Sequence, residues 1–478
     1  MEIVPSTFLA LAAIATLLAV GPYRGLWAFV GLAPFGAAAA LNLPALGGAT
    51  IGQLELTLCV VLLIAAASPG GPDRLLGTLR PGQPGFWLLL VILYGVLSAA
   101  FFPRVFSGAT DIFGLSRDVN EDRIISIPLR PNSGNITQSF YMLLSAACFL
   151  AVATLYRVRP DEGAVLKAMV VCTSLNFGLG LVDVLSSFVG LPDLMDPIRT
   201  ANYAMATQHT MAGIKRMVGG MPEASAFGAF SVVLLGFWLH YWTVAPRSRL
   251  VTAMFAMTGF CVLRSTSSGA YVALIGLLGL YSCWLLWVAA RGAFSRRVAG
   301  LLVWMIIGTW LLGVAIATGY QLVPAVTEFL DDTLLNKLAS DSGVERMSWN
   351  VQALRNFTDT WMIGAGLGSV RASNWLVSCL GSLGLIGTAA YLAFLASMFR
   401  APAHSGNTRR DHVIQALKVA CLAQIVAAMP TAATPNLGTI FFVLAGLVVG
   451  LSRSAVVLPA TPPATALPVP VSHRLGRT

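Results

Sequence analysis

Residues 86–102 read FWLLLVILYGVLSAAFF, a run without a single charged side chain. Such a run approaches the roughly 20 apolar residues that a helix needs to cross the hydrocarbon core of a bilayer. Similar runs recur at Ser231–Trp242 with its flanks, at Tyr271–Ala290 and at Leu301–Thr318. Their alternation with polar gaps predicts a polytopic membrane protein.

The composition of the 478-residue chain agrees with this prediction. Hydrophobic residues make up 56% of it and charged residues only 10%, whereas soluble globular proteins have about 25% charged residues. Lipid offers no partner for a free backbone amide, so helices are expected, and the short alternating segments of a transmembrane β-barrel are missing. The net charge of +10 comes from basic residues spread over many gaps, so we expect no nucleic-acid partner.

The hydropathy pattern predicts an all-α bundle of about 12–14 transmembrane helices. The expected spans are 6–20, 24–42, 51–68, 85–102, 139–157, 163–190, 223–245, 249–264, 268–290, 298–320, 374–399, 413–430 and 435–452. Glycine and proline interrupt the first pair, so one of its members is expected to be short or re-entrant. These residues are Gly21, Pro22, Gly31, Pro34 and Gly36.

Basic residues predict the orientation, because the cytoplasmic loops of membrane proteins carry an excess of Lys and Arg. One set of short gaps is rich in arginine, and the opposite gaps near 43–50 and 431–434 hold none. We assign the arginine-rich set to the cytoplasm, which places three long loops on the outer face of a bacterial inner membrane. These loops are 103–138, 191–222 and 321–373. Residues 1–457 would form the membrane domain and residues 458–478, rich in Pro and Ala, a disordered cytoplasmic tail.

The third long loop is the richest in candidate site residues. Asp341-Ser342-Gly343-Val344-Glu345 predicts a helix start, with a helix over about 343–356. Four of its residues would share one face: Arg346, Trp349, Asn350 and Ala353. An amphipathic helix lying on the membrane surface is the alternative interpretation.

A glycine-rich segment follows that helix. Gly364, Gly366 and Gly368 alternate, and glycine lets a backbone approach a ligand closely. The pattern is no dinucleotide fingerprint, because no βαβ unit surrounds it. Polar candidates for substrate binding come directly afterwards, at Arg371, Ser373 and Asn374.

The second long loop ends in a cationic segment at the mouth of a span. Lys215 and Arg216 are adjacent, and a Gly-Gly pair separates them from Pro222 and Glu223. Proline suits the first turn of the next helix, and a carboxylate is favoured near a helix N-terminus. The alternatives are contact with lipid headgroups for the two cations and simple capping for Glu223.

The other polar features are assigned more limited roles. The turn Ser265-Thr266-Ser267-Ser268 offers hydroxyls to a cavity, or merely to neighbouring helices. The mixed charges of the first long loop predict a solvated surface without chemistry. Asp183 and Glu55, which lie within spans, are expected to face the protein interior. The cysteines have no CxxC or Cys/His spacing, so we expect no metal site and no cofactor.

Taken in order, these motifs resemble the O-antigen ligase and polymerase family of bacterial membrane glycosyltransferases. Arg216 with Gly219-Gly220 and Pro222-Glu223 resembles the family's Arg, Gly and Pro-Asn/Glu element. Ser265–Ala270 resembles its Thr/Ser-x-Ser-Arg-Gly-Ala turn. Arg346 with Trp349 and the glycine-rich segment resembles its large periplasmic loop, and Leu383-Gly384-Leu385-Ile386-Gly387 the Gly-Leu-Ile-Gly that follows. The resemblance covers about 214–387.

The resemblance implies a GT-C-like fold and an activity. A polymerase of this family joins polyprenyl-pyrophosphate-linked oligosaccharide repeat units into an exopolysaccharide or O-antigen chain, with a flippase and a chain-length regulator as possible partners. Arg216 and Arg346 would grip the pyrophosphate, with Lys215 and Arg371 assisting, and Glu223 would orient or deprotonate the acceptor hydroxyl. The chain has no DxD metal motif, so arginines are expected in place of a metal. Ser267, Trp349, Gly366, Gly368, Ser373 and Asn374 complete the expected substrate site.

Two alternative functions stay open. A ligase of the same family would transfer the glycan to lipid A core or to protein, but that branch places a His before the loop Asn, where this chain has Ser373. Ser268 also stands where the family often has Arg. A transporter or flippase would show repeated halves or ionisable helices at mid-membrane, and the sequence shows no convincing internal repeat.

Overall fold

The computed structural model of this chain describes most of its residues. They are 2–43, 49–115, 124–203, 205–208, 210–211, 214–291, 296–324, 327, 330–331 and 341–453. The expected cytoplasmic tail, 458–478, lies outside the described residues.

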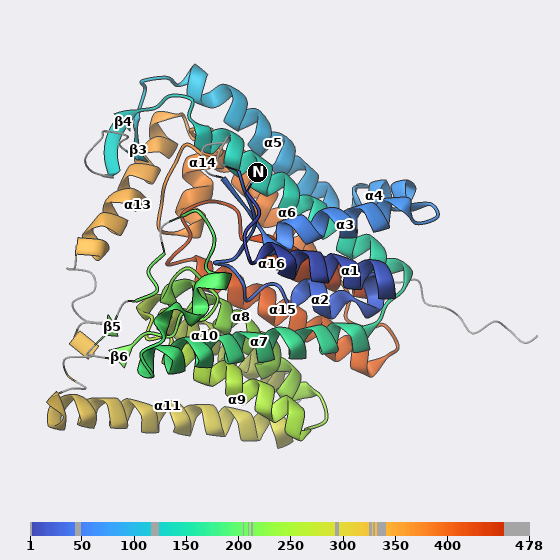
Figure 1. Cartoon of the computed structure of the whole chain (residues 1–478), viewed down its shortest axis with the longest axis vertical. Coiled ribbons are helices and arrows are strands. Elements are labelled where there is room, and N and C mark those ends of the chain that lie inside the picture. Colours follow the sequence, from blue (N-terminus) through green and yellow to red (C-terminus); the bar gives the residue numbers. More distant parts are fainter. Residues whose placement is uncertain are drawn as a thin grey trace, which may run out of the picture.

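The described part of the chain is mostly helical (Figure 1). Its longer helices are α1 (Thr7–Arg24), α3 (Gln53–Ala67), α5 (Pro84–Val105), α6 (Ser133–Val158), α7 (Glu162–Phe188), α8 (Ala224–Val244), α9 (Arg249–Arg264), α10 (Ser268–Ala290), α11 (Arg296–Leu322), α13 (Asp341–Asp359), α14 (Trp375–Phe399), α15 (Thr408–Ala428) and α16 (Thr439–Ser452). Shorter helices are α2 (Leu26–Val30), α4 (Gly71–Thr78) and the 3-10 helix η2 (Pro192–Ile198).

Three antiparallel hairpins accompany the helices. They pair β1 (Ala39–Leu43) with β2 (Ala49–Gly52), β3 (Asp111–Leu115) with β4 (Ile124–Pro128), and β5 (Thr210–Met211) with β6 (Ile214–Lys215). In the second hairpin Phe113 lies opposite Ser126. These short strands are the one departure from the expected all-α fold within the described residues.

The helices define a multi-pass membrane protein. Within the described residues, nine helices are long and apolar enough to span a membrane, or ten if α3 and α4, which meet at a bend of 110°, count as one span. This number is lower than the 12–14 expected. The segments expected at 249–264 and 435–452 form α9 and α16, which have only 16 and 14 residues.

The expected span 24–42 is not one helix, as its glycines and prolines indicated. After α1 the chain forms the five-residue α2 and then turns. It returns alongside α1, because Glu2 pairs with Asn42 and the Ser6 hydroxyl donates to the carbonyl of Ala39. Most residues between 26 and 40 are buried, and burial within protein is what allows irregular backbone at membrane depth.

Aromatic and small residues build the core between α6, α14 and α16. The rings of Phe149 and Phe394 meet edge to face at 5.4 Å, and Phe442 stacks on Phe394. On α16, Gly446 and Gly450 face Val152 and Tyr156 of α6 so closely that an added Cβ would lie 2.8–3.0 Å from them. Small residues let membrane helices approach in this way, where dispersion rather than hydrophobic burial holds helices together.

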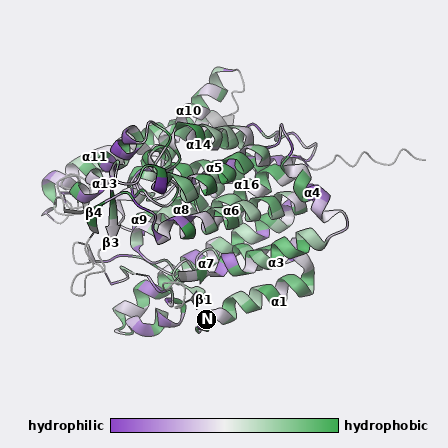
Figure 2. Ribbon diagram, turned by 90° about the horizontal axis from the view of Figure 1, so that it is seen from above, coloured by the Kyte–Doolittle hydropathy of each residue, from purple (hydrophilic) through white to green (hydrophobic). Residues whose placement is uncertain are grey.

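The bundle has two distinct ends (Figures 1 and 2). At one end, here called the polar end, lie α13 and the hairpins β3–β4 and β5–β6. The opposite end, here called the basic end, gathers arginines from several short gaps: Arg159 lies 5.4 Å from the ring of Tyr23, Arg410 pairs with Glu162 at 3.3 Å, and Arg453 donates to Gln83. The described parts of the three long loops thus lie at one end of the bundle.

Candidate functional site

The connection between α13 and α14 forms hydrogen bonds to a break in α14. Gly384 interrupts that helix with φ 62° and ψ −165°. The freed carbonyls of Gly381 and Ser382 accept from the amides of Ala365 (2.8 Å) and Gly366 (3.1 Å), and the amide of Leu385 donates to the carbonyl of Met362 (2.8 Å). The connection therefore supplies the hydrogen bonds that the broken helix lacks, as buried backbone at membrane depth requires.

This connection enters deeply between α5 and α14. The Tyr94 hydroxyl in the middle of α5 donates to the carbonyl of Ile363 at 2.8 Å. Gly384 lies about 14 Å along α14 from Trp375, at a rise of 1.5 Å per residue. The segment is therefore re-entrant. Sequence analysis expected a loop here and gave no sign of its depth.

The alternating glycines serve this packing rather than an open approach to a ligand. Gly364, Gly366 and Gly368 all have positive φ, at 98°, 97° and 85°. A Cβ at Gly366 would lie 2.7 Å from the carbonyl oxygen of Ser98, and one at Gly368 would lie 2.2 Å from that of Gly134. The backbone that approaches so closely is that of α5 and α6, which corrects the expectation drawn from the sequence. Gly368 still borders the cleft described next.

A cleft of about 1160 Å³ opens at the polar end, between the β3–β4 hairpin, the start of α6 and the segment after Gly368. Its described lining is Ile112, Phe113, Gly114, Ile125, Ile127, Arg130, Pro131, Asn132, Ser133, Gly134, Gln138, Gly368, Ser369, Val370, Arg371, Ala433 and Thr434. This lining contains two arginines and no carboxylate. The first long loop, to which the sequence assigned no chemistry, supplies most of this wall. Mixed charges along a strand pair do not reveal what its other face encloses, so this cleft had no signal in the sequence.

Trp349 and Asn350 of α13 position the segment that carries Arg371. The Arg371 guanidinium lies 4.2 Å from the centre of the Trp349 ring, and the Asn350 side chain accepts from the amide of Ser373 at 2.7 Å. Trp349 and Ala353 are buried, and Ala353 packs with Val370 and Ala372 of this segment. Arg346, on the same helix, is half-buried and does not line the cleft.

Arg371 keeps an unsatisfied donor. Its Nε atom is buried and has no hydrogen-bond partner among the described residues. Burial lowers the pKa of its guanidinium, and the charge of Glu345 partly opposes this effect. A buried donor without a partner is rare in native proteins and asks for an explanation, such as an absent ligand.

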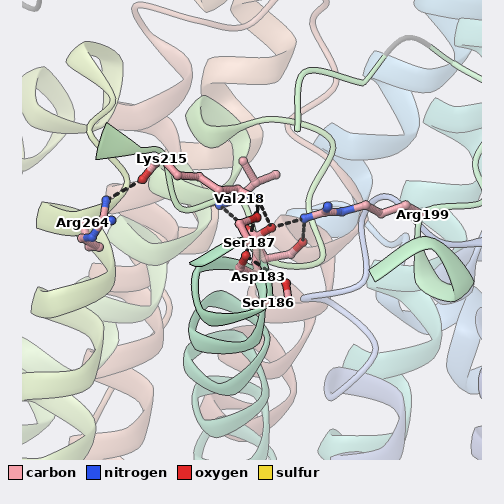
Figure 3. A network of polar contacts seen from close by, with 8 residues as sticks. Asp183, Ser186, Ser187, Arg199, Lys215, Val218 and Arg264 are labelled. Carbon is pink, nitrogen blue, oxygen red and sulfur yellow. Dashed lines mark hydrogen bonds and ion pairs between the residues drawn. The ribbon is translucent and has the colours of Figure 1, made fainter. Parts of the chain in front are cut away.

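A buried ion network fixes the second cationic segment (Figure 3). Asp183 of α7 is fully buried, and its carboxylate accepts from Arg199 at 2.6 Å and from Lys215 at 3.0 Å. The same carboxylate accepts from the amides of Val218 (2.8 Å) and Gly219 (3.1 Å). Asp183 therefore faces the interior, as expected for an ionisable residue in a span, and holds the turn that follows Arg216.

This network gives Lys215 a role other than the direct substrate contact expected from the sequence. Its ammonium group is committed to Asp183 and to the Ser187 hydroxyl. Its carbonyl accepts from Arg264 at 2.8 Å. Lys215 is therefore a fixed cation beside Arg216.

Arg216 and Glu223 lie on either side of the Gly219-Gly220 turn, and the charge of Glu223 acts on Arg216. The Nε atom of Arg216 is buried without a hydrogen-bond partner among the described residues. Burial lowers its pKa, and Glu223 and Tyr271 raise it. Glu223 is exposed at the N-cap position of α8 but makes no capping bond there, and instead accepts from the Ser225 hydroxyl. The capping alternative for Glu223 therefore finds no support.

Two of the other candidates are helix caps. Ser267 accepts from the amide of Ala270 at the start of α10, at 3.4 Å. Asn374 accepts from the amides of Leu376 and Val377 at the start of α14, at 3.0 and 3.2 Å. Such caps satisfy orphan helix amides and explain both residue types without a substrate.

The site residues form two groups. Arg130 and Arg371 line the cleft, with Trp349 beside Arg371, and Arg216 precedes the turn that Asp183 holds. The segment 431–434 borders the cleft, since the carbonyl of Ala433 accepts from the amide of Ala372 at 3.4 Å, and it approaches α10, where a Cβ at Gly269 would lie 3.0 Å from Thr431. No hydrogen bond or ion pair joins Arg216 to Arg371 within the described residues.

Sequence reasoning missed Arg130 and Arg199. Arg199 had a signal, because a carboxylate within a span calls for a cation, and Arg199 is the first basic residue after Asp183. Arg130 had none, since its place beside Arg371 depends on the tertiary fold. No model of a known protein family matches this chain, and no curated protein matches it.

Proposed function

We propose that this protein is a membrane glycosyltransferase that polymerises polyprenyl-pyrophosphate-linked oligosaccharide repeat units. One observation carries the proposal: Arg216 and Arg371, from two separate motifs of the family resemblance, each keep a buried Nε donor without a partner in the described structure. Both lie at the polar end of a multi-pass bundle. A lipid-linked diphosphate would reach that end with its prenyl chain in the bilayer.

The proposed reaction needs cations beside its leaving group. An acceptor hydroxyl oxygen attacks the anomeric carbon of the donor, and the bond from that carbon to the pyrophosphate oxygen breaks. The acceptor proton leaves to a base, and negative charge grows on the departing polyprenyl pyrophosphate. Guanidinium groups bind phosphate oxygens in bidentate fashion and stay charged.

The charges around the α7–α8 connection suit that role. Arg199, Lys215, Arg216 and Arg264 provide four cations, while Asp183 and Glu223 provide two carboxylates. A preorganised excess of positive charge at a partly buried site stabilises a developing anion strongly. We assign the grip on the pyrophosphate to Arg216, with Arg371 and Arg346 completing it when substrate is bound and Lys215 contributing its fixed charge.

The proposal includes an orientation. The polar end would face the periplasm of the bacterial inner membrane, and the basic end the cytoplasm, as the distribution of arginines predicts. A GT-C-like architecture, a flippase that delivers the repeat unit and a regulator of chain length belong to the same proposal. Ser373, in place of a His before Asn374, favours polymerase over ligase.

Arg216→Ala and Arg371→Ala are each expected to reduce polymer formation about 100-fold or more, the usual cost of losing one such donor. The assay is elongation of defined polyprenyl-pyrophosphate-linked repeat units by purified protein in detergent micelles, with the products resolved as a ladder. Arg355→Ala is the matched control, because Arg355 is an exposed arginine of α13 that does not line the cleft.

Wild-type ladders from both variants would contradict the assignment of the two arginines. Transfer of a finished glycan to lipid A core, without elongation, would indicate a ligase. Movement of the lipid-linked unit across liposome membranes without a new glycosidic bond would indicate a flippase.

A Glu223→Gln variant is expected to elongate roughly 100-fold more slowly, as is usual when a general base is removed. Glutamine keeps the size of the side chain but cannot accept the acceptor's proton. Ser225→Ala is the comparison variant, because it removes only the hydroxyl that donates to Glu223 and keeps the carboxylate. Equal rates for Glu223→Gln and wild type would leave Glu223 without a part in the chemistry.

A further inference from the structure

The cleft at the polar end has room for more than the reacting groups. Its volume of about 1160 Å³ exceeds the usual 300–1,000 Å³ of small-molecule pockets. Ile112, Ile125 and Ile127 form an apolar wall, and Gln138, Ser133 and Thr434 present polar groups to the same space. This combination suits a chain of sugar rings, whose CH faces pack on apolar side chains while their hydroxyls form hydrogen bonds.

The described lining of the cleft carries charge of one sign. Its described lining includes Arg130 and Arg371 and no Asp or Glu. Neither arginine forms an ion pair within the described part of the chain, and Arg130 is exposed. Two unpaired cations facing one space repel each other, and an anionic ligand between them would relieve that repulsion.

The two cations are differently held. Arg371 is fixed over the ring of Trp349 and keeps its buried Nε donor free. Arg130 directly precedes α6, whose first residue, Ser133, also lines the cleft. The positive end of that helix dipole adds to the preference for a negative group. The cleft therefore combines one fixed guanidinium, one exposed guanidinium and a helix start.

We propose that this cleft binds an acidic oligosaccharide and that Arg130 selects its carboxylate. The inference rests on the proposed function for its biological role, since it makes the repeat unit of the polymer a uronic-acid-type glycan. A carboxylated sugar would contact all parts of the lining. Its ring would pack on the apolar wall, and its carboxylate would accept two hydrogen bonds from the guanidinium. A free diphosphate would leave the apolar wall without a partner.

The test is direct binding to the purified full chain in detergent micelles, measured by isothermal titration calorimetry. The probes are a galacturonic acid hexasaccharide and maltohexaose, which have equal length and differ in charge. We expect the acidic probe to bind at least about tenfold more tightly, as one charge-assisted bidentate pair allows. Arg130→Gln should abolish this difference, Arg130→Lys should retain part of it, and the matched control Arg355→Gln should leave it unchanged.

Equal binding of the two hexasaccharides by wild type, or an undiminished preference in Arg130→Gln, would overturn the inference. Loss of inorganic pyrophosphate binding in Arg130→Gln, in step with the loss of the acidic preference, would also overturn it, because Arg130 would then belong to the diphosphate site. The elongation assay separates the two proposals. Elongation without the binding preference would remove the inference alone, and the preference without elongation would leave an acidic-glycan site on a protein with another activity.

Discussion

An Asp183→Asn variant is expected to lose about 3–5 kcal/mol of stability, the cost of breaking a buried ion pair at one partner. Asparagine leaves the guanidinium of Arg199 and the ammonium of Lys215, whose side chains are 5% and 13% exposed, without a counter-charge. Its amide group would also turn a donor toward the backbone amides that Asp183 now satisfies. The α7–α8 connection, and with it Arg216, would lose its fixed position.

Thermal unfolding in detergent micelles, followed by size-exclusion chromatography, measures this loss. Asp161→Asn is the matched control, because Asp161 caps the other end of the same helix and Asn caps helices equally well. Lys215→Met should cost less than Asp183→Asn, since Asp183 would keep Arg199 as its partner. An Asp183→Asn protein as stable as wild type would show that the network does not hold this connection.

The helix bodies were the part of the fold that the sequence predicted best. Apolar runs such as 86–102 and 271–290 fall within α5 and α10, and the helix expected at 343–356 is α13. These elements depend on local hydrophobicity and on capping residues that lie within a few positions of the helix start. The grouping of the long loops at one end was also predictable, because alternating spans dictate it.

The site depends on partners far apart in the chain, which local patterns do not reveal. Asp183 meets amides 35 and 36 residues later, and Asn135 donates to the Leu367 carbonyl 232 residues later. The glycine-rich segment shows the same limit. Its pattern predicted a close approach of the backbone to a ligand, whereas in the fold the approached surface is the protein itself. For the same reason, the sequence does not reveal that Arg130 and Arg371 line the same cleft.

A Gly384→Ala variant is expected to lose roughly 2–6 kcal/mol, the sum of a backbone conformation reserved for glycine and of overpacking. At φ 62° and ψ −165° a side chain is strained even in open space. Here the added Cβ would lie 2.1 Å from the carbonyl oxygen of Ile363 and 2.5 Å from that of Met362. Both neighbours are backbone atoms, which cannot rotate away as a side-chain end can.

The consequence of this clash would extend beyond α14. The re-entrant connection would have to leave the break, and the amides of Ala365 and Gly366 would lose their carbonyl partners at membrane depth, where no water replaces them. Arg371 follows on the same segment, so the cleft would lose its fixed cation as well. The yield of monodisperse protein after detergent extraction measures the effect, with Gly279→Ala as control, because that helical glycine of α10 has open space around it. An unchanged yield for Gly384→Ala would mean that the connection does not need the break, and that its depth is set by α5 alone.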